Sequence, residues 1–301
     1  MNTPCFNISA VERDTGLSKD VLRMWERRYG FPLPGRDNNG ERTYPAEQVD
    51  RLRQIKRLMD AGHRPGKLIA TPVEELSQLA PRRSEARLLA EQPGRNELNE
   101  LIGLIKQHDA LGYQQAMQQR LARQGLQYFV QDTIAPLTQQ VGAAWEDGSV
   151  EVFEEHLFTE LTKRLLRQAI AALPGGQRSP RILLTSVPDE HHVLGLLMVE
   201  AIFSLEGAEC IPLGTQMPLL EIVRAANAHH VHIVALSFSA AFPARQIPGL
   251  LQQLRLALPV EIALWAGGSG VQRLAPLSAV VLLTSFDAAR TALAEWRAAN
   301  A

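Results

Sequence analysis

The chain has 301 residues, of which 46% are apolar and 21% charged, with a formal net charge of −1 at pH 7. This length allows two or three domains, and the composition excludes a disordered chain, a collagen-like repeat and a small disulfide scaffold. No apolar run approaches the roughly 20 residues of a membrane span, and the N-terminus lacks the pattern of a secretory signal. The only cysteines are Cys5 and Cys210. We therefore expect a cytoplasmic protein without a cysteine-built metal site.

Charge is distributed unevenly along the chain. Residues 1–67 contain 13 Lys and Arg against 9 Asp and Glu, whereas residues 68–301 contain 18 against 23. A basic N-terminal part on an acidic remainder indicates that the N-terminal part contacts a polyanion.

The first elements predict a helix-turn-helix followed by a hairpin. Apolar residues recur at helical spacing over 8–25, the pattern is interrupted at Thr15, and Ser18 can cap the next helix. Two short helices joined by such a turn are typical of a helix-turn-helix. A Gly- and Asn-rich hairpin over 36–44 and a helix over 45–60 follow.

The middle of the chain shows almost no strand signal. Helical stretches are expected near 83–92, 96–107, 109–123, 126–145 and 149–173, with short polar breaks between them. An antiparallel helix bundle is the natural packing of such helices. A linker rich in Pro and Gly then covers 173–180.

The last part alternates between two kinds of pattern. Short apolar runs with β-branched residues occur at 181–187, 210–213, 233–239, 262–266 and 280–284. Amphipathic helical patterns lie near 192–206, 218–229, 244–256, 270–276 and 286–298. Five strands alternating with helices predict a doubly wound parallel sheet of the Rossmann or flavodoxin type, with ligands at the carboxyl ends of the strands.

These patterns together predict a multidomain α and α/β chain. We expect a winged helix-turn-helix domain over 1–78, a helix bundle over 79–175 and the five-stranded parallel-sheet domain over 176–301.

Basic and aromatic residues on the second helix and on the hairpin are candidates for DNA contact. They are Arg23, Arg27, Arg28, Tyr29, Arg36, Arg42 and Tyr44. Arg pairs with guanine edges or phosphates, and the Tyr hydroxyl donates to phosphate, whereas the alternative is a solvated basic face. The strings VLRMWERRYG at 21–30 and GERTY at 40–44 resemble MerR-type winged-helix domains. This resemblance implies a double-stranded DNA operator as partner.

Short motifs follow three strands of the predicted sheet. They consist of Glu190, His192 and Gly195 after the first strand, Ser237 and Ser239 at the end of the third, and Gly267 and Gly268 at the end of the fourth. A His at the tip of a strand-to-helix loop can bind a metal centre, and a nearby carboxylate can fix its tautomer. Glycines allow a bulky ligand to approach the backbone. A strand-end His is otherwise an ordinary solvated loop residue.

The spacing of these motifs, with 41 residues between Gly195 and Ser237, resembles the cobalamin-binding pattern D-x-H-x-x-G…S-x-L…G-G. Glu190 stands in place of the usual Asp, and Ser239 in place of the usual Leu. By resemblance, His192 is the lower axial ligand of cobalt and displaces the dimethylbenzimidazole of the cofactor. That base then occupies a slot near Ser237 and the glycine pair, and the neighbouring His191 is an exposed loop residue.

The bundle carries a third motif, in which nine residues separate Trp145 from Glu155-His156. Without further information these are a core aromatic and ordinary helix residues. The spacing resembles the W-x9-E-H signature of light-responsive MerR-type repressors of the CarH/LitR group. By resemblance, Trp145, Glu155 and His156 hold the 5′-deoxyadenosyl group of adenosylcobalamin. In that group a His after the Trp captures cobalt once light breaks the Co–C bond. This chain has Glu146 there, and a carboxylate is a poorer ligand for Co(III).

The resemblance covers essentially the whole chain and implies a transcriptional repressor, not an enzyme. It implies adenosylcobalamin binding, a response to light, and a homo-oligomer, a tetramer in the dark cofactor-bound state, with no membrane association. Three alternatives stay open. They are the corrinoid module of a methyltransferase or mutase, a cobalamin-independent MerR-type regulator controlled by a protein partner, and a constitutive DNA-binding protein with an inert body.

Overall fold

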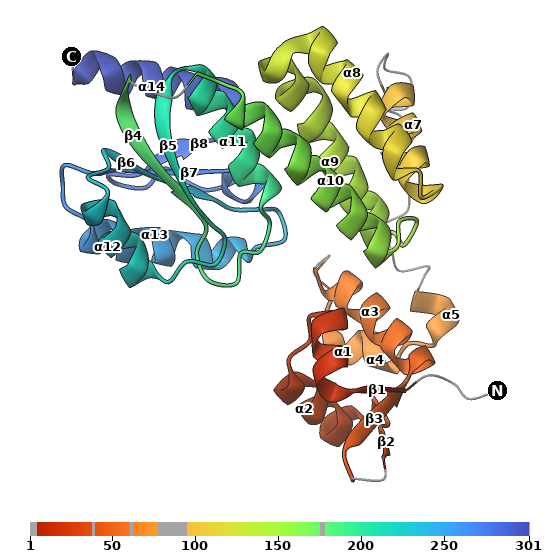
Figure 1. Cartoon of the computed structure of the whole chain (residues 1–301). Coiled ribbons are helices and arrows are strands. Elements are labelled where there is room, and N and C mark those ends of the chain that lie inside the picture. Colours follow the sequence, from red (N-terminus) through yellow and green to blue (C-terminus); the bar gives the residue numbers. More distant parts are fainter. Residues whose placement is uncertain (1–4, 38–39, 61–62, 77–94, 175–177, 301) are drawn as a thin grey trace. The chain divides into compact units, whose positions relative to one another are not determined.

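The computed structural model describes residues 5–37, 40–60, 63–76, 95–174 and 178–300 (Figure 1). The chain divides into two compact units, the first with residues 1–95 and 141–152 and the second with residues 96–140 and 153–301. The helix expected near 83–92 and both expected domain boundaries, at 78/79 and 175/176, lie outside the described residues.

The N-terminal domain of the first unit contains the predicted helix-turn-helix. Its elements are β1 (Cys5–Asn7), α1 (Ile8–Thr15), α2 (Lys19–Tyr29), β2 (Gly35–Arg36), β3 (Arg42–Pro45), α3 (Ala46–Asp60), α4 (Pro65–Ala70) and α5 (Val73–Leu76). The Ser18 side chain accepts a hydrogen bond from the Val21 N–H, and Gly16 ends α1 in the left-handed conformation. The predicted turn between the first two helices is therefore confirmed.

A small antiparallel sheet supports the hairpin, with strand order β1-β3-β2. Strand β1 was not expected from the sequence, and it places Phe6 opposite Tyr44. The buried side chains of Leu22, Trp25 and Leu52 join α2 and α3 in one core. This core fixes the orientation of α2, the helix that carries most of the predicted DNA contacts.

The middle of the chain is a series of helices. Its elements are α7 (Arg95–Lys106), α8 (Ala110–Tyr128), a π-helical turn η1 (Phe129–Ile134), α9 (Ala135–Glu146) and α10 (Val152–Ala171). Most of their residues belong to the second unit, whereas residues 141–146 of α9 group with the first. The expected break near residue 125 is present, because Gly125 has φ 72° and ψ 160° and interrupts the helical path inside α8. A hydrogen bond of 2.8 Å joins the buried Tyr113 and Thr162 hydroxyls and pairs α8 with α10.

The predicted five-stranded parallel sheet is confirmed, with strand order β5-β4-β6-β7-β8. Its strands are β4 (Arg178–Thr185), β5 (Ala208–Gly214), β6 (Ile233–Ser237), β7 (Ala263–Gly267) and β8 (Val281–Leu283). Its helices are α11 (Leu194–Leu205), α12 (Leu219–Ala228), α13 (Ile247–Ala257) and α14 (Phe286–Ala299). The chain order reverses at β4, and ligands bind at such switch points in doubly wound sheets.

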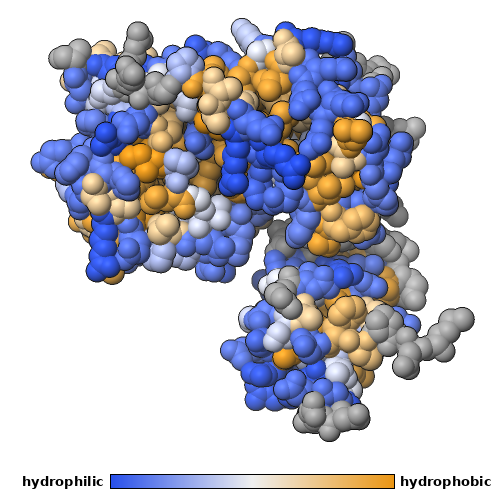
Figure 2. Space-filling view, in the orientation of Figure 1, coloured by the Kyte–Doolittle hydropathy of each residue, from blue (hydrophilic) through white to orange (hydrophobic). Residues whose placement is uncertain are grey.

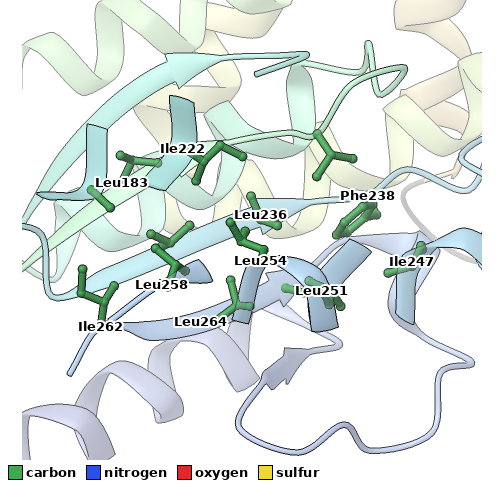
Figure 3. Close-up of a cluster of buried hydrophobic side chains, with 14 of the residues drawn as sticks. Leu183, Ile222, Leu236, Phe238, Ile247, Leu251, Leu254, Leu258, Ile262 and Leu264 are labelled. Carbon is green, nitrogen blue, oxygen red and sulfur yellow. The ribbon is translucent and has the colours of Figure 1, made fainter. Parts of the chain in front are cut away.

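Both faces of this sheet are covered by helices, so the strands are apolar on both sides. Figure 3 shows the core on one face, where Leu236 and Leu264 pack against Ile222 of α12 and Leu251 of α13. On the other face, Trp265 packs in a second core with residues of α11 and α14. The helices thus anchor the strands and hold their carboxyl ends in register.

The helix predicted near 270–276 is wrong. Only a 3-10 turn, Ser269–Val271, is present there. Gly270 and Pro276 both disfavour a continuous helix, and the short amphipathic pattern of this segment was too weak a signal.

Among the described residues, no helix is long and apolar enough to cross a membrane. On the face drawn in Figure 2, hydrophilic residues predominate and are interrupted by apolar patches.

Candidate functional site

The loop that joins β4 to α11 is fixed by a buried serine. Ser186 Oγ donates to the Glu190 carbonyl oxygen at 2.7 Å and accepts from the Gln216 N–H at 2.9 Å. The Ser186 carbonyl accepts from the Met217 N–H at 2.9 Å. These bonds tie the loop to the segment after β5. Sequence reasoning missed Ser186, because a strand-end serine carries no signal of partners 30 residues away.

The Glu190 side chain lies in this loop and is only 1% exposed. Its Oε1 is 2.7 Å from His192 Nδ1 and accepts from the His192 N–H at 3.0 Å, and its Oε2 accepts from the Ser239 N–H at 2.7 Å. Burial by itself raises the pKa of Glu190, but the hydrogen bonds from His192 and Ser239 outweigh it and lower the pKa. The structure thus brings two predicted site residues, His192 and Ser239, to the ionised carboxylate of a third, Glu190.

This arrangement assigns the tautomer of His192. An ionised carboxylate can only accept, so Nδ1 carries a proton, and in the neutral imidazole Nε2 then carries the lone pair that a metal requires. The His192 side chain is 60% exposed, whereas its partner is buried. A buried carboxylate that orients an exposed imidazole is the arrangement expected of a metal-binding histidine.

Glycines allow the neighbouring backbones to approach closely. A Cβ on Gly195 would lie 2.7 Å from Ser237 Oγ, and one on Gly268 would collide with the Phe238 carbonyl oxygen. Gly268 also has a φ of 96°, which L side chains rarely adopt. A Cβ on Gly267 would have more room, with the Leu283 carbonyl oxygen 3.3 Å away. Gly195 therefore lies against Ser237, and Gly267 and Gly268 lie against neighbouring backbone, at the carboxyl ends of the strands.

The bundle motif lies on α9 and α10. His156 is exposed, and its Nδ1 is 2.8 Å from Glu155 Oε2, while Glu155 Oε1 accepts from Thr159 Oγ1 at 2.8 Å. Trp145 is half-buried in the last turn of α9. It lies in the part of α9 that groups with the other compact unit. Its approach to Glu155 and His156 stays a prediction.

The predicted DNA-binding residues differ in how their side chains are held. Arg27 is exposed, and the exposed Arg28 guanidinium lies 5.3 Å from the Tyr29 ring centroid. Arg23 is paired with Asp20 in the same helix at 3.3 Å. Exposed guanidinium groups on one helix provide the charge that phosphate contact requires.

The two hairpin arginines make contacts of their own. Arg36 donates to the Gly40 carbonyl oxygen at 2.6 Å. Arg42 Nε donates to Glu26 Oε2 of α2 at 2.9 Å, and this hydrogen bond and the charge of Glu26 raise the pKa of Arg42. Arg42 therefore joins the hairpin to the helix that carries the exposed arginines.

The expectation that Tyr44 contacts DNA is wrong for this conformation. Its side chain is 0% exposed and lies in the core of the N-terminal domain. Pairing with β1 places Tyr44 on the inner face of the sheet, and β1 was not predicted. Burial, the largest effect, raises the pKa of Tyr44.

Replacing Tyr44 with phenylalanine tests this core position. The hydroxyl is buried and has no hydrogen-bond partner among the described residues. We expect Tyr44→Phe to bind duplex DNA within about twofold of wild type and to unfold with an unchanged or up to about 1 kcal/mol higher free energy. Fluorescence anisotropy and urea denaturation measure the two quantities. A tenfold loss of DNA affinity would instead mean that the hydroxyl reaches the DNA.

Two parts of the chain match models of known protein families. Residues 6–69 match the MerR HTH family regulatory protein model, and residues 97–170 match the B12 binding domain model. The chain thus contains a MerR-type helix-turn-helix domain and a B12-binding domain.

Individual proteins are similar to the chain over most of its length. The chain is 28% identical to the HTH-type transcriptional repressor CarH of Myxococcus xanthus, over 89% of this chain and 90% of the relative. It is 27% identical to the HTH-type transcriptional repressor CarA of the same organism, over 88% and 87%. The monomethylamine corrinoid protein of Methanosarcina barkeri aligns with a TM-score of 0.53 at 14% identity, covering 67% of this chain and all of that protein. This last likeness concerns the fold alone.

Proposed function

We propose that the chain is a transcriptional repressor that binds adenosylcobalamin and releases its operator in response to light. The observation that carries the proposal is the pairing of His192 with the buried Glu190 at the carboxyl ends of the strands. This pairing belongs to a chain that also has a MerR-type domain and a B12-binding domain.

The residues at the carboxyl ends of these strands fit a corrin cofactor. His192 would provide the lower axial nitrogen through Nε2, with Glu190 holding the ring. Ser237 would donate to a nitrogen of the cofactor tail, and Gly195, Gly267 and Gly268 would allow the tail to pass between the backbones. Gly195 packs against Ser237 Oγ and Gly268 against the Phe238 carbonyl oxygen, so the glycines bring the assigned residues close together at the strand ends, which supports this assignment.

The adenosyl group would be held by Trp145, Glu155 and His156 of the bundle. When bound, adenosylcobalamin supplies a cobalt–carbon bond that light can break. A hydrogen bond from Thr159 orients the Glu155 carboxylate, and the exposed His156 ring beside it is free to contact the adenosyl group. Glu146 follows Trp145 directly, so we do not expect a second imidazole to be supplied from that position.

Regulation would operate through assembly. A homo-oligomer, a tetramer in the dark, presents several N-terminal domains to one operator, and multivalency raises avidity without new contacts. The cofactor must then bind the assembled state more tightly than the dissociated state, with a coupling of typically about 1–3 kcal/mol. The MerR-type domain favours this regulatory role over that of an enzyme's corrinoid module.

DNA affinity with and without the cofactor tests the proposal. An operator is first selected from random duplex DNA by the protein itself, and binding is then followed by anisotropy. We expect adenosylcobalamin in the dark to tighten binding at least about fivefold, and green light to reverse the gain. Equal affinity in all three states would contradict the proposal and favour a constitutive or partner-controlled regulator.

Two variants show whether the helix-turn-helix is the surface that binds the DNA in this assay. Replacing both Arg27 and Arg28 with alanine should weaken DNA binding with cofactor, without cofactor and after light. It should also reduce the steepness with which the logarithm of the DNA-binding constant falls with the logarithm of the salt concentration, by up to about 2. Arg164→Ala, at an exposed arginine of α10, is the matched control and should bind like wild type.

A further inference from the structure

Ser239 lies beside the tip of β6 and contacts the Glu190 carboxylate in two ways. Its N–H donates to Oε2 at 2.7 Å, and its Oγ donates to Oε2 at 2.9 Å and to Oε1 at 3.2 Å. His192 contacts Oε1 of the same carboxylate through its backbone N–H and its Nδ1. The carboxylate therefore bridges two loops that are 49 residues apart in the sequence.

Both partners of this bridge are departures from the usual cobalamin motif, which has Asp and Leu at these positions. Glu has one more methylene than Asp and reaches the β6 tip. A Leu side chain could not donate a hydrogen bond, and it would place apolar atoms beside a carboxylate that is 1% exposed. An ionised group in such a position requires hydrogen bonds, and the Ser239 hydroxyl supplies one of them.

The same short segment also contacts the glycine region. The Phe238 N–H donates to the Gly267 carbonyl oxygen at 2.9 Å, and a Cβ on Gly270 would lie 2.6 Å from the Ser239 carbonyl oxygen. A shift of Ser239 therefore affects both the histidine loop and the turn after β7. One short segment thus contacts both regions assigned to the cofactor.

We propose that Ser239 is a positioning residue for His192, and that Ser239 and Glu190 work as a matched pair in orienting the axial histidine. This inference rests on the proposed cobalamin site. It predicts that the two departures depend on each other, so that replacing one is harmful and replacing both with the usual Asp and Leu is tolerated.

Four variants test the pairing with adenosylcobalamin as the probe, in the dark. The readouts are the dissociation constant from equilibrium dialysis and the absorption spectrum, which distinguishes histidine-ligated from unligated cobalt. Ser239→Leu should weaken binding about 10- to 100-fold and lose the histidine-ligated spectrum, as for other groups that orient a metal ligand. Ser239→Thr keeps the hydroxyl and should retain the wild-type spectrum.

The other two variants complete a double-mutant cycle. Glu190→Asp alone should weaken binding, whereas Glu190→Asp with Ser239→Leu should bind more tightly than Ser239→Leu alone. A double variant whose loss equals the sum of the single losses would overturn the pairing. Thermal unfolding accompanies each measurement. Should Ser239→Leu fail to fold, Ser239→Ala replaces it, because it removes only the hydroxyl, and a wild-type spectrum in that variant would overturn the inference.

This experiment distinguishes a failure of the proposed cobalamin binding from a failure of the Ser239–Glu190 pairing. A wild-type protein that retains no adenosylcobalamin would overturn the proposed function and with it the pairing. A wild-type protein that binds, together with a Ser239→Leu variant of equal affinity and spectrum, would overturn the pairing alone.

Discussion

Replacing His192 with alanine is expected to weaken adenosylcobalamin binding by at least about 100-fold, because loss of a metal ligand costs at least as much as loss of its supporting groups. The histidine-ligated absorption spectrum should disappear at the same time. Equilibrium dialysis and absorbance in the dark measure both effects.

The adjacent His191 is the matched control. His191 is also exposed and lies in the same loop, but the Glu190 carboxylate is hydrogen-bonded to the His192 ring. His191→Ala should bind within about threefold of wild type, because exposed substitutions away from a site change energies little. Equal losses in the two variants would contradict the assignment of His192 as the axial ligand.

Replacing Gly268 with alanine should have the largest effect on stability. The substitution puts a Cβ against the Phe238 carbonyl oxygen at a φ of 96°. We expect the free energy of unfolding to fall by at least about 2 kcal/mol, because a side chain is strained in this conformation and the backbone must also move. Urea denaturation of the full chain measures this change.

Replacing Gly249 with alanine is the matched control, and we expect it to have the opposite effect on stability. Gly249 lies inside α13, and a Cβ there meets nothing within 4 Å. Gly249→Ala should raise the stability by up to about 1 kcal/mol, because alanine is the better helix former. A loss at Gly249 as large as that at Gly268 would mean that the close contact with Phe238 is not the cause.

The sequence was most informative where local patterns decide the structure. The short apolar runs with β-branched residues, such as 233–239, predicted all five strands, and Ser18 after a Gly turn predicted the start of α2. Motif spacing also selected Glu190 and His192, which lie in contact.

Long-range partners could not be predicted in the same way. The three-residue strand β1 is too short to give a periodic signal, and it is the strand that buries Tyr44. The hydrogen bonds of Ser239 to Glu190 join residues 49 apart, and no local pattern contains them. Ser186 likewise acts through the segment after β5. In each case the three-dimensional course of the chain decides the partner.

Size-exclusion chromatography with absorbance at cobalamin wavelengths tests the central claim most directly. The purified protein is mixed with adenosylcobalamin in the dark and run before and after exposure to green light. We predict that the cofactor elutes with the protein in a larger species in the dark, and that light converts it to a smaller one. A protein peak without cobalamin absorbance in the dark would contradict the account.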